Sequence, residues 1–312
     1  MTDVPGSLIA FQQHFPDEAA CAAYLAAVRW PHGFVCPRCG HSKAWLLQTK
    51  AWTYECAGCR KQTSVTAGTI LHGSKLPLTL WFWAAYLMAT HSNGISALQL
   101  QHQLALGSYK TAWLLCAKLR ASMVAPERNP LYGLVEVDET EIACRSKNDP
   151  PAGGGGRSHQ GKILVVGAVE VHDGGVGPGR IRLQEVPDYS AASLHPFLAT
   201  NLAPGATAKT DGWSGYPGAP GVHHDPHTVG KMAAHIVLPW THRVFSNLKT
   251  WALGVYHGLR REHLQSYLDE FVFRFNRRHH RHASFRSLLA IADRLWVKHH
   301  LDQSEEKLRF SK

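Results

Sequence analysis

The chain has 312 residues, and its 33 Lys and Arg against 23 Asp and Glu give a net charge of +10. Hydrophobic residues make up 45% and charged residues 18%, which excludes intrinsic disorder, and the sequence has no period of a collagen or coiled-coil rod. The length suits about two domains. The basic excess indicates a polyanionic partner, most commonly nucleic acid, although a solvated basic surface would give the same charge.

The composition also predicts the compartment. Residues 1–15 lack the pattern of a signal peptide, which is a basic segment followed by an apolar one. Seven cysteines in a chain without that pattern indicate a reducing environment. The longest apolar run, near Leu78–Met88, is too short to span a bilayer. We therefore expect a soluble cytoplasmic protein with no membrane partner.

Residues 1–33 are predicted to form an N-terminal helical segment. Apolar residues recur at helical spacing between positions 8 and 30, and Pro31 and Gly33 end the pattern.

The next segment, 34–70, carries two C-x2-C pairs with sixteen residues between them. The cysteines are Cys36, Cys39, Cys56 and Cys59. Four thiolates complete a tetrahedral Zn²⁺ site without an open position, which predicts a structural zinc ribbon built on a hairpin and a further strand. Gly40 and Gly58 are expected to supply the left-handed backbone of the two turns. Unrelated reduced cysteines, or a redox pair, are the alternative.

Residues 71–125 are predicted as three helices. WFWAAYLMATH forms the first, Asn93-Gly94 separates it from ISALQLQHQLAL, and Gly107-Ser108 separates that helix from YKTAWLLCAKLRASM. A helix, a short glycine turn and a helix make a helix-turn-helix-like DNA-binding segment, although an ordinary helical bundle has the same spacing.

The pattern changes near residue 130, and 130–295 is predicted as a mixed α/β domain followed by a tail at 296–312. The predicted strands are YGLVEVDETEI, KILVVGAVEV, GRIRLQEV and ATAKTDGW, and the predicted helices are SAASLHPFLATNL, about 240–252 and 262–277. HHDPH at 223–227 could be a metal cluster, but a loop near the site is preferred because its spacing fits no strong ligand motif.

Two aspartates stand at predicted strand ends. Asp138 follows an alternating apolar strand in VEVDET, and Asp211 lies in KTDGW. Carboxylates on neighbouring strands could bind Mg²⁺ through hard oxygen ligands, and two such ions could hold the attacking and leaving oxygens of a phosphodiester. Glu136 shares a face with Asp138 and Glu139 takes the other, so the choice of ligand is open. Both aspartates could instead cap turns.

The order of these motifs resembles the zinc-ribbon insertion-sequence transposases with an RNase H-like DDE-type catalytic domain. The resemblance covers about residues 10–295 and rests on the cysteine pairs, VEVDET, KTDGW, LPWTHRVFSNLKTWALGVYHG and HLQSYLDEFVFRFNRR. It implies a bacterial, nucleoid-associated protein that cleaves DNA with Mg²⁺ or Mn²⁺. Asp138 and Asp211 would be the first and second metal-binding carboxylates.

The third site residue departs from the usual Glu of this pattern. A basic residue commonly follows that Glu by seven positions, and here Lys249 follows His242 at that spacing, while residues 231–261 contain no Glu. The resemblance therefore makes His242 the third site residue and Lys249 its basic partner, with Asn247 as the competing choice. Imidazole suits Mg²⁺ poorly and Mn²⁺ better. His242 could also be a residue at the start of a helix.

A basic stretch, RFNRRHHRHASFR, occupies 274–286 and is expected to form one helix with a phosphate-binding face. A solvated surface helix is the alternative. The predicted DNA contacts are Arg274, Arg277, Arg278, Arg281, Lys162 and Lys209.

These features predict a DNA transposase that cleaves transposon ends and transfers the strand to a target. We expect DNA with terminal inverted repeats as partner, and at least a dimer, because two ends must be held together. The alternatives are a catalytically decayed zinc-ribbon DNA-binding regulator and a protein-interaction scaffold.

Overall fold

The computed structural model describes residues 5–125, 128–145, 161–227 and 234–294. These form two compact units. The first contains the described residues up to 125 together with 279–294, and the second contains 128–278. No helix in the described ranges has the length and apolar character needed to cross a membrane.

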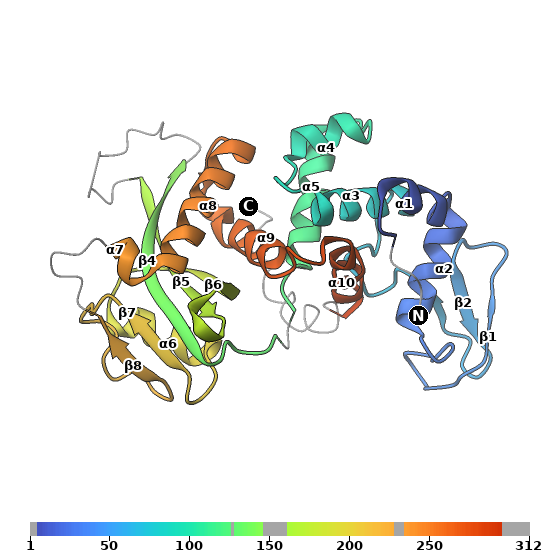
Figure 1. Cartoon of the computed structure of the whole chain (residues 1–312). Coiled ribbons are helices and arrows are strands. Elements are labelled where there is room, and N and C mark those ends of the chain that lie inside the picture. The colour runs from blue at the N-terminus through green and yellow to red at the C-terminus, as the bar shows by residue number, and fades with distance from the viewer. Residues whose placement is uncertain (1–4, 126–127, 146–160, 228–233, 295–312) are drawn as a thin grey trace, which may run out of the picture. The chain divides into compact units, whose positions relative to one another are not determined.

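The first unit holds the zinc-ribbon strands and most of the helices (Figure 1). The region predicted as one stretch at 8–30 forms two helices, α1 (Leu8–His14) and α2 (Glu18–Arg29), because Asp17 caps the second with a hydrogen bond from the Ala20 N–H. The strands β1 (Ala44–Leu46), β2 (Thr53–Cys56) and β3 (Gln62–Ser64) form the predicted antiparallel sheet. The predicted helices follow as α3 (Leu78–Thr90), α4 (Ala97–Gln103) and α5 (Tyr109–Ala121).

An aromatic core holds this unit together. α3 is apolar on nearly all sides and largely buried, as expected for a central helix. α10 (Arg281–Arg294) packs against it, and the Phe285 ring lies 5.4 Å from Phe11 and 5.8 Å from Phe82. The α/β domain was predicted to end at 295, but the second unit ends at Arg278, because α10 packs with the N-terminal helices of the first unit.

The second unit is built on a mixed sheet with the strand order β6-β5-β4-β7-β8. β4 (Leu134–Arg145), β5 (Lys162–Val171) and β6 (Pro178–Val186) are antiparallel, while β7 (Thr207–Thr210) and β8 (His223–Pro226) continue parallel to β4. Three antiparallel strands extended by two parallel ones give an RNase H-like sheet, which confirms the predicted fold class. A short strand, β9 (Leu259–Arg260), also pairs with β4.

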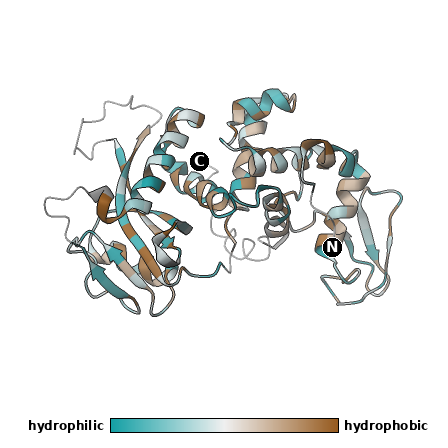
Figure 2. Ribbon diagram, in the orientation of Figure 1, coloured by the Kyte–Doolittle hydropathy of each residue, from teal (hydrophilic) through white to brown (hydrophobic). Residues whose placement is uncertain are grey.

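Helices cover both faces of this sheet. α6 (Ala191–Asn201) packs on one face, over a core that includes Val135, Val137 and Phe197. α8 (Pro239–Tyr256) and α9 (Leu264–Asn276) pack on the other, and a short α7 (Ala234–Val237) precedes α8. Figure 2 shows hydrophobic colour along the central strands and more hydrophilic colour on outer loops. Alternation along β4 therefore sends odd residues toward α6 and even residues toward α8.

Two of the elements predicted after residue 220 are wrong. Residues 223–226 form β8 and not a loop, because their backbone pairs with β7 and the His224 ring lies 2.9 Å from the Thr210 hydroxyl. The basic stretch 274–286 is not one helix, because α9 ends at Asn276 and α10 begins at Arg281.

Candidate active site and metal centre

The parallel pairing of β4 with β7 brings the two predicted aspartates to equivalent positions. Glu136 lies opposite Lys209 in the register, so Asp138 and Asp211 each stand two residues further along. Asp138 is 8% exposed, while Asp211 follows the end of β7 and accepts a hydrogen bond from the Trp213 N–H at 3.0 Å. The prediction that Asp138 stands at a strand end is wrong, because β4 continues to Arg145, but the pairing of β4 with β7 ends at Glu136 and places both carboxylates just beyond it.

Burial raises the pKa of Asp138 to about 7. The Glu139 backbone N–H donates to its Oδ1 at 2.9 Å and opposes the rise, whereas the negative charges of Asp211 and Glu136 increase it. A carboxylate that is hard to ionise among other acids is an electrostatic feature of catalytic and cation-binding sites.

α8 brings His242 to the same place. Its Nε2 lies 3.4 Å from Oδ2 of Asp138, and the ring is about one third exposed. Asn247 is exposed and lies five residues further on, which is roughly 140° around the helix from His242. The geometry therefore favours His242 over Asn247 as the neighbour of Asp138.

Lys249 lies two helical turns beyond His242. Partial burial lowers the pKa of Lys249, the Glu141 carboxylate opposes this change, and the charge of Lys162 adds to it. Lys162 Nζ lies 3.0 Å from Oε2 of Glu141, and both residues line the same cavity as Lys249. The lysine side chain of α8 thus faces the sheet edge that carries Asp138.

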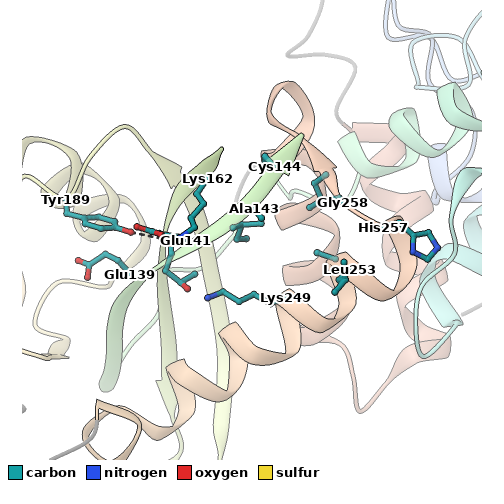
Figure 3. A pocket seen from close by; sticks show the side chains of 14 residues that line it. Glu139, Glu141, Ala143, Cys144, Lys162, Tyr189, Lys249, Leu253, His257 and Gly258 are labelled. Carbon is teal, nitrogen blue, oxygen red and sulfur yellow. Dashed lines mark hydrogen bonds and ion pairs between the residues drawn. The ribbon is translucent and has the colours of Figure 1, made fainter. Parts of the chain in front are cut away.

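An open cavity of about 770 Å³ adjoins these residues (Figure 3). It lies along the part of β4 between Glu136, the last partner of β7, and Cys144, the first partner of β9. Its polar lining residues are Glu139, Thr140, Glu141, Lys162, Tyr189, Lys249 and His257, and its apolar lining includes Ile142, Ala252 and Leu253. The cavity therefore begins along β4 at Glu139, the residue after Asp138, while Asp138, Asp211 and His242 are not among its lining residues.

Glu139 is a further acidic residue here, next to Asp138 but on the α6 face. Burial raises its pKa to about 7, the Tyr216 hydroxyl opposes the rise, and the charges of Asp138 and Asp211 add to it. The Tyr216 side chain is fully buried. The sequence left open whether Glu139 is a metal ligand. Strand alternation alone does not show that the loop after β7, which carries Tyr216, covers the face of β4 on which Glu139 lies.

The predicted DNA-contacting residues differ in their surroundings. Lys209 lies beside Glu136 and Arg281 is exposed at the start of α10. Three other arginines contact the second unit itself: Arg274 pairs with Glu270 at 3.7 Å, Arg277 lies over the Phe273 ring at 4.0 Å, and Arg278 lies over the Phe275 ring at 4.2 Å. Burial lowers the pKa of both Arg277 and Arg278. Packing within the unit thus occupies much of the stretch predicted as a phosphate-binding face.

The four predicted zinc ligands gather in the first unit. Cys36, Cys39, Cys56 and Cys59 offer sulfur atoms that all lie within 4.8 Å of one another, and they are the one such group of three or more His, Cys, Asp or Glu ligands among the described residues. This fits a closed tetrahedral Zn²⁺ site of structural type.

The glycine prediction for the zinc turns is half wrong. Gly40 has a φ of 72°, but the left-handed residue of the second turn is Arg60, with a φ of 57°, and not Gly58. Arg60 directly follows the second cysteine of its pair, as Gly40 does, so the two turns are equivalent. Gly58 instead lies close to His41, whose Cγ would be 3.3 Å from an added Cβ.

Comparisons with known protein families found one match in the N-terminal part of the chain and one in the α/β domain. The family model described as an ISXO2-like transposase domain matches residues 130–276, and the model described as a transposase zinc-ribbon domain matches residues 16–62. The comparison with curated proteins and the comparison with solved structures gave no match.

Proposed function

The chain belongs to the zinc-ribbon insertion-sequence transposases with an ISXO2-like domain, and from this premise we propose that it cleaves DNA at transposon ends and transfers the freed strand to a target. The observation that carries the proposal is the meeting of Asp138 with Asp211 across β4 and β7, with His242 at 3.4 Å from Asp138. These groups come from three separate elements. Their convergence next to a cavity that is lined by the neighbouring Glu139 and by Lys249 supports a role in chemistry over a role in capping turns.

Asp138 and Asp211 would hold Mg²⁺ or Mn²⁺. The donor set fits, because carboxylate oxygens are the ligands that these ions prefer. Burial is the main cause of the raised pKa of Asp138, and the charges of Asp211 and Glu136, which a cation would offset, add to it. His242 adds an imidazole nitrogen, which favours Mn²⁺ over Mg²⁺. When bound, such ions polarise a phosphodiester and stabilise the charge that develops on its oxygens.

The reaction would take place in two steps at this site. The oxygen of a water molecule attacks a phosphorus atom at the transposon end, and the bond from that phosphorus to the 3′ oxygen breaks, which leaves a 3′-OH. That hydroxyl then attacks a phosphorus atom of the target DNA, and the target strand is cut as the new bond forms. Lys249 would balance phosphate charge, and Asp138 with His242 would orient the reacting groups.

DNA is the proposed partner of both units. The helix-turn-helix-like pair α4 and α5, the zinc ribbon, Lys162, Lys209 and Arg281 would contact it, together with any exposed part of Arg274, Arg277 and Arg278. We expect at least a dimer, since two transposon ends must be held together, and action at the nucleoid of a bacterial cytoplasm.

The test is nicking of DNA that carries the candidate terminal repeats, in Mg²⁺ and in Mn²⁺. Asp138→Ala and Asp211→Ala are each expected to reduce nicking by about 1,000-fold or more, because each removes a metal-binding carboxylate. Asp188→Asn is the control, since Asp188 is an exposed residue that accepts bonds from Ser190 and Ser193.

Nicking that persists in both alanine variants would overturn the assignment of the aspartates. If the wild type binds the repeats but nicks them in neither metal, the chain is a decayed regulator that retains DNA binding.

A further inference from the structure

The helix that carries His242 begins without a cap of its own. The residue before α8 is Leu238, which supplies no side-chain hydrogen bond, and Pro239 at the first helical position has no N–H. The first free donors are therefore the N–H groups of Trp240 and Thr241. Buried donors of this kind cost free energy unless an acceptor reaches them.

Glu136 of β4 is that acceptor. Its Oε2 accepts hydrogen bonds from the N–H of Trp240 at 2.9 Å, the N–H of Thr241 at 2.9 Å and the Thr241 hydroxyl at 3.3 Å. Glu136 is 2% exposed. The two N–H bonds and the helix dipole favour the carboxylate and offset part of the cost of burying it, although burial still raises the pKa of Glu136.

The same contact fixes the register between α8 and β4. Glu136 and Asp138 are two residues apart on one face of the strand, and Thr241 and His242 are consecutive on the helix. When Glu136 holds Thr241, His242 reaches Asp138 at 3.4 Å. A change of about 1 Å in the start of α8 would separate this pair beyond hydrogen-bonding range.

We propose that Glu136 is a positioning residue of the active site, which acts by fixing the first turn of α8 so that His242 meets Asp138. Its side-chain oxygen does this by accepting the hydrogen bonds of Trp240 and Thr241, which requires the full length of the glutamate side chain. Glu136 does not contact the substrate. This inference rests on the proposed function, because His242 matters only if the site cleaves DNA.

Two variants distinguish the effect of the length of the Glu136 side chain from the effect of its charge. Glu136→Gln keeps an oxygen at the same reach without the charge, and Glu136→Asp keeps the charge but shortens the side chain by one methylene. We expect Glu136→Gln to cleave bound DNA within about threefold of the wild type, and Glu136→Asp to be slower by about 10- to 100-fold, because small misplacements of catalytic groups cost this much. DNA affinity should be unchanged in both.

Glu18→Asp is the matched control. Glu18 caps α3 in the same manner, with its carboxylate accepting the N–H groups of Leu78 and Thr79 at 2.7 Å, but it belongs to the other unit. Its variant should loosen α3 without changing the cleavage rate of bound DNA. Equal losses in Glu18→Asp and Glu136→Asp would indicate a general effect on stability and overturn the proposal.

A double-mutant cycle with His242→Ala tests whether Glu136 acts through His242. If it does, Glu136→Asp should cause no further loss in the His242→Ala background, whereas independent roles would multiply the two losses. Losses of rate that multiply in the double variant, or an active Glu136→Asp with an inactive Glu136→Gln, would overturn the proposal.

Hydrogen exchange gives a readout that does not depend on cleavage. Amides of the peptide covering 238–245 should exchange faster in Glu136→Asp and near the wild-type rate in Glu136→Gln. Unchanged exchange in Glu136→Asp overturns the proposal even if cleavage falls. If no protein nicks DNA but exchange behaves as expected, the proposed function fails while the contact between Glu136 and α8 stands.

Discussion

Asp138 and Glu139 are adjacent in β4 yet face opposite sides of the sheet, and burial raises the pKa of each to about 7. A carboxyl with a higher pKa in the folded than in the unfolded protein binds its proton more tightly when folded. Its contribution therefore favours folding below the ordinary pKa near 4 and is lost as the pH rises through 7. These two residues should make the protein less stable in alkali when no divalent cation is present.

Glu139→Gln tests this expectation. The variant removes a charge that is buried and repelled at pH 8, so it should raise the free energy of unfolding there by ~1–3 kcal/mol and have much less effect at pH 5. Calorimetric melting at both pH values, in buffer free of Mg²⁺ and Mn²⁺, measures the difference. An equal gain at pH 5 and pH 8 would mean that the charge of Glu139 is not the cause.

At the residue scale, the sequence was informative where a pattern is local. Strand alternation predicted Asp138, and a seven-residue spacing linked His242 with Lys249. The partners of Glu136 lie more than 100 residues away, at Trp240 and Thr241, and no local pattern announces such a contact. Long-range hydrogen bonds to a helix N-terminus become visible only once the sheet topology is known.

At the element scale, α8 packs closely against the sheet where its Phe245 ring lies over Gly167 of β5. Gly167 lies opposite Asp138 in β5, and an added Cβ there would stand 2.5 Å from Cε1 of Phe245. Gly167→Ala should therefore destabilise the protein by ~1–3 kcal/mol through overpacking and move α8 away from Asp138, with a loss of nicking.

Gly254→Ala, on α8 itself, is the control for Gly167→Ala, because an added Cβ there meets nothing within 4 Å. It should be neutral or slightly stabilising, since Ala is the better helix former. A Phe245→Leu change should recover part of the stability lost in Gly167→Ala. Thermal unfolding and nicking rates measure both effects, and a Gly167→Ala protein as stable as the wild type would contradict the close packing.

Elements with strong periodicity were predicted well, and those set by tertiary contacts were not. The stretch YGLVEVDETEI alternates in hydrophobicity, and β4 was found where that pattern predicts a strand. β8 has the sequence His-His-Asp-Pro, which has no strand propensity, and it forms because β7 offers a free edge. The basic stretch 274–286 looked like one helix by composition, but it is divided between α9 and α10, which pack in different units.

At the scale of the whole molecule, the described residues form two compact units. The second unit has an apolar core on each face of its sheet, while the first has the aromatic core around Phe11, Phe82 and Phe285 and, in addition, the cluster of four cysteines. Structural zinc in a small ribbon contributes ~10–16 kcal/mol of apparent binding free energy, so a chelator should unfold β1–β3. The mixed sheet holds none of these cysteines and should keep its structure.

Zinc removal should therefore weaken DNA binding, while the mixed sheet that contains β4 stays folded. In the proposed function the ribbon contributes phosphate contacts, and their loss should lower the affinity and also the slope of log affinity against log salt concentration. Binding titrations at several salt concentrations, with and without chelator, measure both, and amide exchange of β4 reports on the sheet. Cys21→Ala, which changes a buried cysteine outside the zinc site, is the control that should keep its zinc. Simultaneous loss of protection in β2 and β4 would show that the two units do not fold separately.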